Sequence, residues 1–186
     1  MHAPSAGTVQ EAEGKVLDID PEVEIAKLLS LGYARTFQGE LIAKFFVNDR
    51  DQALRLRLEE SGWVLNYKGG AAPEETEQVK IRPELETGVT VPENMEAILE
   101  AIGFEKVRTV TKTRTTFILE NGAGEKIGHV EIDEYPGIPP LLEIESDTHD
   151  KVLAIGATLG FPPERIVSDT IRDLEKRYGV RLGTKE

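Results

Sequence analysis

Charged residues recur at every second position in strand-like stretches along most of the chain. In residues 54–58, two arginines alternate with three leucines, and further on Glu143 and Glu145 alternate with Leu142 and Ile144. Successive residues of a strand point to opposite faces of a sheet, so each stretch has one charged and one apolar face. The pattern therefore predicts a sheet that is charged on one side and covered by apolar contacts on the other.

The same alternation predicts eight strands, separated by loops rich in glycine, proline and asparagine. They are expected over residues 9–17, 41–47, 53–58, 63–68, 79–86, 106–120, 127–133 and 141–145. Four helices are expected, each marked by a capping residue or a proline at its start and a glycine near its end. They cover residues 21–32, 92–103, 148–159 and a last stretch that begins near 163 or 168 and ends at 179. The predicted fold class is α+β, built mainly on an antiparallel sheet.

Composition limits the remaining choices. The chain has 186 residues, 39% of them hydrophobic, which fits one domain of ordinary size. We expect this domain over residues 11–186, after a flexible leader over residues 1–10. The absence of cysteine excludes disulfides, iron–sulfur clusters and cysteine nucleophiles. A net charge of −12 argues against duplex nucleic acid and anionic membranes as partners. With no apolar stretch near the roughly 20 residues that span a bilayer, the expected location is the cytoplasm. The sequence is compatible with a homodimer but contains no residue pattern that predicts one.

The charged face of the sheet has two explanations. It can lie in water, or the sheet can close into a barrel that turns the charges inward, where they must be paired or hold a ligand. The candidate cations are Lys15, Arg55, Arg57, Lys68, Lys80, Arg82, Lys112 and Arg114, and the candidate acids are Glu11, Glu13, Glu84, Glu86, Glu131, Asp133, Glu143 and Glu145. Such a set suits a polyphosphate, held by arginine and lysine, together with a divalent metal held by carboxylates.

The order of the charged residues along the chain carries a family resemblance. Glu11, Glu13 and Lys15 form a Glu-x-Glu-x-Lys motif, and a series of charged positions follows it. The series consists of Arg55 and Arg57, Lys68, Arg82 with Glu84 and Glu86, Lys112 with Arg114, Asp133, and Glu143 with Glu145. Over residues 11–177 the chain resembles the CYTH domain family, the triphosphate tunnel metalloenzymes, which includes class IV adenylate cyclases and thiamine triphosphatase-like proteins.

The resemblance implies a closed eight-stranded antiparallel β-barrel, with a triphosphate bound in its tunnel and helices packed outside. It implies that Mg²⁺ or Mn²⁺ is bound by Glu11, Glu13, Glu143, Glu145 and Asp133. It implies phosphate binding by Lys15, Arg55, Arg57, Lys68, Arg82, Lys112 and Arg114, and Lys80 joins them because it shares a strand face with Arg82. The implied catalytic residues are Lys112, Asp133, Glu84 and Glu86.

The chain departs from the family pattern at two places. Residues 45–47 read Phe-Phe-Val where the family often has Tyr-Phe-Asp, which removes the phenol of a Tyr–Lys pair that some members use with the lysine matching Lys112. Asn66 replaces a threonine two residues before the phosphate-binding Lys68. His129 alternates with Glu131 and Asp133; we expect it at the rim or in solvent, with contact to the tunnel as the alternative.

Three functions follow from the resemblance. The first is a metal-dependent hydrolase of a triphosphate, with inorganic tripolyphosphate, thiamine triphosphate and nucleoside triphosphates as candidate substrates. The alternative is a class IV adenylate cyclase, in which the 3′-hydroxyl of ATP attacks the α-phosphorus and pyrophosphate leaves. The third is a non-catalytic module that binds triphosphate compounds.

Overall fold

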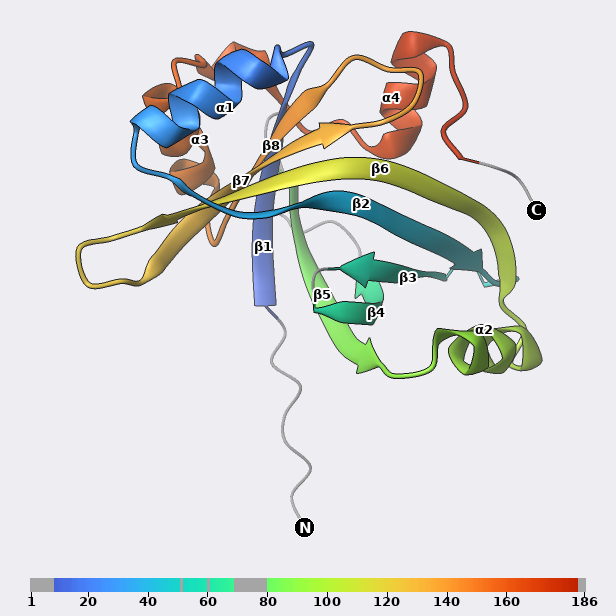
Figure 1. Ribbon diagram of the computed structural model, residues 1–186. Helices are drawn as coiled ribbons and strands as arrows, with labels where there is room; N and C mark the ends of the chain where they lie inside the picture. The colour runs from blue at the N-terminus through green and yellow to red at the C-terminus, as the bar shows by residue number, and fades with distance from the viewer. Residues whose placement is uncertain (1–8, 51, 60, 69–79, 184–186) are drawn as a thin grey trace.

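Nine strands and four α-helices make up the computed structural model (Figure 1), which describes residues 9–50, 52–59, 61–68 and 80–183. Side chains are described over the same ranges except at residues 9–11, 68, 80–84 and 126. The strands are β1 (Val9–Leu17), β2 (Ala34–Val47), β3 (Ala53–Glu59), β4 (Gly62–Lys68), β5 (Lys80–Val89), β6 (Glu105–Glu120), β7 (Lys126–Glu134), β8 (Leu141–Ser146) and β9 (Ile166–Val167). The helices are α1 (Pro21–Ser30), α2 (Pro92–Ala101), α3 (His149–Thr158) and α4 (Ile171–Tyr178), with a 3₁₀ turn at Pro163–Arg165.

The strands form one antiparallel sheet that closes on itself. Their order is β5-β4-β3-β2-β6-β7-β8-β1, and β1 pairs with β5 as well as with β8. At this seam the register places Glu13 opposite Lys80, while on its other side β1 places Glu13 opposite Glu145. The short β9 pairs with Lys15 and Val16 of β1, past the residues of β1 that pair with β5. The predicted α+β fold with a closed eight-stranded barrel is therefore confirmed.

Two apolar clusters hold α1, α2 and α3 to the outside of the barrel, and another holds α4 against residues such as Phe45 and Tyr135. Figure 1 shows α1 and α3 together over β1, β7 and β8, with α2 beside β3 and β4. The largest cluster joins Leu28 of α1 and Val152 of α3 to strand residues such as Ile144. A second cluster packs Leu174 of α4 with Val110 of β6 and with the ends of β1 and β8, and a third packs Leu99 of α2 against β2 and β3. Because the apolar strand residues face these helices, the alternate charged residues face inward.

The largest differences from the predicted boundaries lie at β2 and at the last helix. β2 begins at Ala34 rather than at residue 41, and its first half is polar and largely exposed. Backbone hydrogen bonds to β6, starting with Ala34 opposite Ile118, hold this half of β2 in the sheet. These bonds do not depend on apolar side chains, so the sequence shows no hydrophobic alternation that would predict the strand. The last helix begins at Ile171, later than expected, because residues 163–167 form the 3₁₀ turn and β9.

The predicted leader falls mostly on residues 1–8, which lie outside the described residues; β1 starts at Val9. None of the helices in the described ranges has the length and apolar composition needed to cross a lipid bilayer.

Candidate functional site

The barrel encloses a cavity of about 580 Å³. Side chains from β1, β2, β3, β5, β6, β7 and β8 line it, together with Thr170 and Ile171 at the start of α4. Nine of the predicted site residues are among them: Glu13, Lys15, Arg55, Arg57, Glu86, Lys112, Arg114, Glu143 and Glu145. Residues far apart in the sequence thus meet in one cavity, as the barrel explanation of the charged face requires.

Five further predicted residues have strand positions but no described side chain. They are Glu11, Lys68, Lys80, Arg82 and Glu84. Their backbones lie at the seam of the barrel and beside it, where Glu11 is opposite Arg82 and Lys68 is opposite Glu84. Their contacts with the cavity lie outside what the structure describes.

Asp133 is the most buried of the predicted site residues, with no exposed surface. Its Oδ2 accepts hydrogen bonds from Lys112 Nζ and Arg114 Nη2, each at 2.6 Å, and its Oδ1 accepts one from Arg114 Nε at 2.6 Å. Burial would lower the pKa of Arg114, but Asp133, Glu131 and Glu143 outweigh it and raise that pKa well above its ordinary value. Asp133 therefore fixes the two cations in place rather than facing the cavity itself.

Lys15 and Glu143 form a second buried pair. Lys15 Nζ donates to Glu143 Oε1 at 2.6 Å and to Glu13 Oε1 at 3.3 Å, and Arg114 Nη2 reaches Glu143 Oε2 at 3.1 Å. Burial would raise the pKa of Glu143, but the charges of Lys15 and Arg114 hold it well below its usual range. The ammonium of Lys15 and the carboxylate of Glu143 are therefore both charged at neutral pH.

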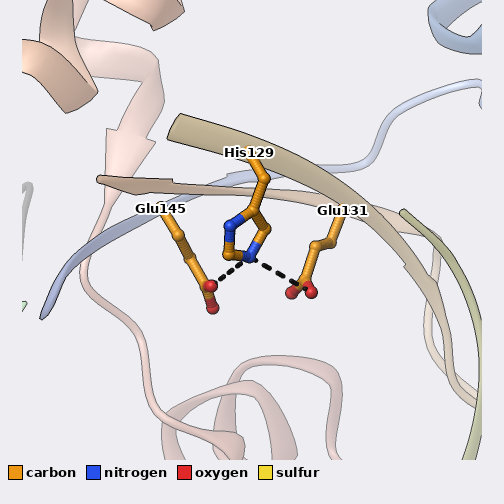
Figure 2. Close-up of side chains that lie close together, drawn as sticks. All are labelled: His129, Glu131 and Glu145. Atoms are coloured by element: carbon orange, nitrogen blue, oxygen red, sulfur yellow. Dashed lines mark ion pairs between the residues drawn. The ribbon is translucent and has the colours of Figure 1, made fainter. Parts of the chain in front are cut away.

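His129 lines the cavity with its side chain only 16% exposed, which fits the alternative of contact with the tunnel and excludes a position in solvent. Figure 2 shows its Nε2 between the carboxylates of Glu131 and Glu145, 3.4 Å from Glu131 Oε1 and in ion-pair contact with Glu145 Oε2. Burial would lower the pKa of His129, but hydrogen bonds to the two carboxylates raise it to about 10. The alternation of His129 with Glu131 and Asp133 was the signal that places it inside.

The opposite side of the cavity carries two arginines. Arg57 Nη2 donates to Glu86 Oε1 at 2.8 Å, and its guanidinium also pairs with Glu59. Asn66, 1% exposed, donates from Nδ2 to Glu86 Oε1 at 2.8 Å, and its Oδ1 lies 3.4 Å from Arg55 Nη2. The amide that departs from the family pattern therefore links a cation and an acid of the predicted site.

Tyr135 also lines the cavity, and the sequence prediction missed it. Lys112 Nζ lies 5.4 Å from the centroid of its ring. Burial raises the pKa of the Tyr135 phenol, so the group stays protonated at neutral pH. Tyr135 follows His129, Glu131 and Asp133 at the same spacing of two residues, and continuing that spacing past the end of the strand predicts it. A phenol thus lies near Lys112, although Phe45 occupies the position where the family often has tyrosine.

Two groups of side chains offer ligand atoms within 4.8 Å of one another and so could hold a divalent cation. One is Glu13, Glu143 and Glu145, three of the predicted metal ligands, and the other is His129, Glu131 and Glu145. Carboxylate oxygens are the ligands that Mg²⁺ and Mn²⁺ prefer, so the first group fits the predicted ion. Within the described part of the chain, Asp133 belongs to neither group.

Comparison with known proteins gives a consistent result. The model of the CYTH domain family matches residues 41–160. A protein of Methanocaldococcus jannaschii named "Putative adenylate cyclase" is 28% identical over 146 residues, which cover 75% of this chain and 78% of that protein.

Solved structures share the fold at low sequence identity. A "putative adenylate cyclase" from Vibrio parahaemolyticus superposes with a TM-score of 0.73 at 15% identity and covers 91% of this chain and 99% of its own. A protein from Hippeastrum, described as a "putative adenylyl cyclase" with a dominant triphosphatase activity, has a TM-score of 0.60 at 19% identity, with 92% and 97% covered.

Proposed function

Because the chain belongs to the CYTH domain family, we propose that it is a divalent-metal-dependent hydrolase of a triphosphate compound. The observation that carries the proposal is the cavity itself, in which Arg55, Arg57, Lys112 and Arg114 face the carboxylates of Glu13, Glu143 and Glu145. A site for an anion alone would need the cations but not a cluster of acids. Cations and metal-binding acids together suit a substrate with several phosphates and an accompanying metal.

The cations bind the triphosphate in this proposal. Arg55 and Arg57 offer planar guanidinium groups that suit bidentate contacts with phosphate oxygens. Lys15, Lys112 and Arg114 lie across the cavity and are already fixed by carboxylates, so they stay oriented when the substrate enters. Lys68, Lys80 and Arg82 complete the set at the β5 side of the barrel.

The carboxylates have two roles. Glu13, Glu143 and Glu145, with Glu11 on the same strand face as Glu13, hold Mg²⁺ or Mn²⁺, which when bound neutralises phosphate charge during phosphoryl transfer. Glu86, whose Oε1 accepts from both Arg57 and Asn66, is the candidate to orient the attacking water, together with Glu84. Asp133 acts on the reaction by positioning Lys112 and Arg114 rather than as a metal ligand.

The chemistry requires little covalent participation by the protein. Phosphoryl transfer depends mostly on positioning and on stabilising charge at the transferred group. Lys112 is poised for this because its Nζ is held on Asp133 at 2.6 Å. Burial and Arg114 would lower the pKa of Lys112, but Asp133, Tyr135 and Glu143 raise it, so Lys112 remains a cation at neutral pH.

An adenylate cyclase activity is the second candidate, because the Methanocaldococcus and Vibrio proteins carry that name. It uses the same cations and metal ligands but directs the 3′-hydroxyl of ATP to the α-phosphorus. Hydrolysis is preferred because it needs only a water and no adenosine pocket.

The test is a product assay on the purified chain with tripolyphosphate, thiamine triphosphate and ATP, each with Mg²⁺ or Mn²⁺. Glu13→Gln removes a metal ligand, and Glu134→Gln, at an exposed position of β7, is the matched control for the loss of one carboxylate. Orthophosphate release that Glu13→Gln abolishes and Glu134→Gln preserves is the expected result. Cyclic AMP with pyrophosphate would instead establish the cyclase, and tripolyphosphate binding without turnover would leave a binding module.

A further inference from the structure

Glu59 is an acid of the cavity that the strand prediction left out. β3 continues to Glu59, just beyond the predicted end of the strand at residue 58, so Glu59 shares a strand face with Arg55 and Arg57. The side chains of all three residues line the cavity. Glu59 therefore brings a negative charge to the side of the cavity that carries the proposed phosphate-binding arginines.

The guanidinium of Arg57 lies between two carboxylates. Its Nη2 donates to Glu86 Oε1 at 2.8 Å, and its Nε is in ion-pair contact with Glu59 Oε1. The side chains of Arg57 and Glu59 are 25% and 28% exposed, so water reaches this ion pair. The Nε and Nη2 edge of a guanidinium suits bidentate binding of a phosphate, and in Arg57 the protein's own acids occupy that edge.

The two carboxylates differ in what else holds them. Glu86 Oε1 also accepts a hydrogen bond from Asn66 Nδ2 at 2.8 Å. Among the described residues, only Arg57 makes an ion pair or hydrogen bond with the carboxylate of Glu59, which belongs to neither group of potential metal ligands. When Arg57 turns to another anion, Glu86 keeps a donor from the protein, whereas Glu59 is left with water.

The charges around Glu59 favour this exchange. Burial raises the pKa of Glu59, Arg57 opposes the effect and Glu86 adds to it. Arg55 and Arg114 also favour the ionised form, yet the pKa of Glu59 stays above its ordinary value. A phosphate at Arg57 adds more negative charge beside Glu59, which favours its protonation or its movement towards water. Either response releases the Nε of Arg57.

We propose that Glu59 is a positioning residue that occupies Arg57 in the free protein and is displaced when a phosphate group of the substrate binds there. The inference rests on the proposed function, because the triphosphate is the competing anion. Before the substrate enters, Glu59 holds the guanidinium in place. The cost of displacing Glu59 lowers the net affinity for the triphosphate.

Calorimetry of a methylene-bridged triphosphate in Mg²⁺ at about pH 8 tests the exchange with the full chain. Glu59→Gln keeps the shape of the side chain but removes the charge that competes with phosphate. This variant should bind the analogue about 5-fold more tightly than the wild type, on the scale of a partly exposed ion pair. Glu100→Gln, at an exposed position of α2 outside the cavity, is the matched control for the loss of one carboxylate and should leave the affinity unchanged.

Two further readouts separate competition from a purely structural role. As the pH is lowered from about 8 towards 5, wild-type Glu59 takes up a proton, because its pKa is raised, and the affinity ratio of the two proteins should fall towards one. In an Arg57→Gln background, Glu59→Gln should no longer tighten binding, because Glu59 and the phosphate then share no cation. Melting temperatures without ligand identify any variant that fails to fold, in which case Glu59→Ala replaces Glu59→Gln.

The proposal is overturned if folded Glu59→Gln binds the analogue with wild-type or weaker affinity, or if the same gain persists without Arg57. Weaker binding would mean that Glu59 orients Arg57 for phosphate and stays in place. A wild type that binds no triphosphate would contradict the proposed function and this inference together. A wild type that binds it, with no effect of Glu59→Gln, would contradict this inference alone, so the two failures are distinguishable.

Discussion

The two sides of the cavity use their charges differently. On one side, which we call the paired wall, Lys15, Lys112 and Arg114 are tied to buried carboxylates, and the side chain of Asp133 is 0% exposed. On the other side, which we call the arginine wall and which comprises Arg55, Arg57, Asn66 and Glu86, the side chains of Arg57 and Glu86 are 25% and 40% exposed. The cations of the paired wall are therefore fixed by buried carboxylates, whereas those of the arginine wall are accessible to a ligand.

The packing behind each wall accounts for the difference. The strands of the paired wall, β1, β6, β7 and β8, are covered by α1, α3 and the largest apolar cluster, so their inner charges are shielded from water. The arginine wall is covered by α2 and the smaller cluster around Phe46, Leu56 and Leu99. Shielded charges must be neutralised within the protein, whereas accessible ones can exchange partners when a ligand arrives.

The largest effect should come from breaking the paired wall. Arg114→Met leaves Asp133, Glu131 and Glu143 without a shared cation, and removing one partner of a buried ion pair typically costs about 3–5 kcal/mol. Urea unfolding measures the loss. Arg57→Met is the matched control on the arginine wall, where partly exposed pairs contribute at most about 1 kcal/mol. Equal destabilisation by the two variants would contradict the distinction between the walls.

A smaller effect is expected at Asn66, a buried and uncharged residue of the arginine wall. Asn66→Leu removes a donor to Glu86 and an acceptor near Arg55, and should lower the free energy of unfolding by about 1–3 kcal/mol. If Asn66 also orients the arginine wall for phosphate, the variant should raise KM for tripolyphosphate more than it lowers kcat. An unchanged KM would restrict Asn66 to a structural role.

The third effect concerns pH and the metal-free protein. The pKa of His129 is raised from 6.5 to about 10 in the fold, so its stabilising contribution is fully present below pH 6.5 and is lost as the pH rises toward 10. Between pH 7 and 10 the wild-type chain in chelator should therefore lose at least about 1 kcal/mol more than His129→Gln, since one pKa unit corresponds to about 1.4 kcal/mol. Parallel pH profiles for the two proteins in urea unfolding would refute this.

The smallest effect is expected at Tyr135. Its ring contacts Lys112, and Tyr135→Phe keeps that contact, so kcat should change by less than about 10-fold, or about 1.4 kcal/mol. Tyr135→Leu should reduce kcat further because it removes a cation–π contact worth about 0.5–2 kcal/mol. A larger loss in Tyr135→Phe would show that the phenol itself takes part, in place of the tyrosine that Phe45 replaces.

The sequence predicted much of this arrangement because strand periodicity decides which side of a sheet a residue occupies. Arg55 and Arg57, Lys112 and Arg114, and Glu143 and Glu145 all line the cavity as expected. It could not predict which charges meet, because that depends on the register between strands far apart in the chain. Asp133 was expected to bind metal, yet the register opposite Arg114 gives it two cations as partners.

Calorimetry of a methylene-bridged triphosphate in Mg²⁺ measures whether the arginine wall supplies the accessible phosphate-binding cations. Charge-assisted hydrogen bonds contribute about 1.5–3 kcal/mol each, so Arg55→Gln with Arg57→Gln should weaken binding by at least about 100-fold while the melting temperature stays close to that of the wild type. Affinity equal to the wild type in a folded double variant would mean that cations outside the arginine wall bind the triphosphate.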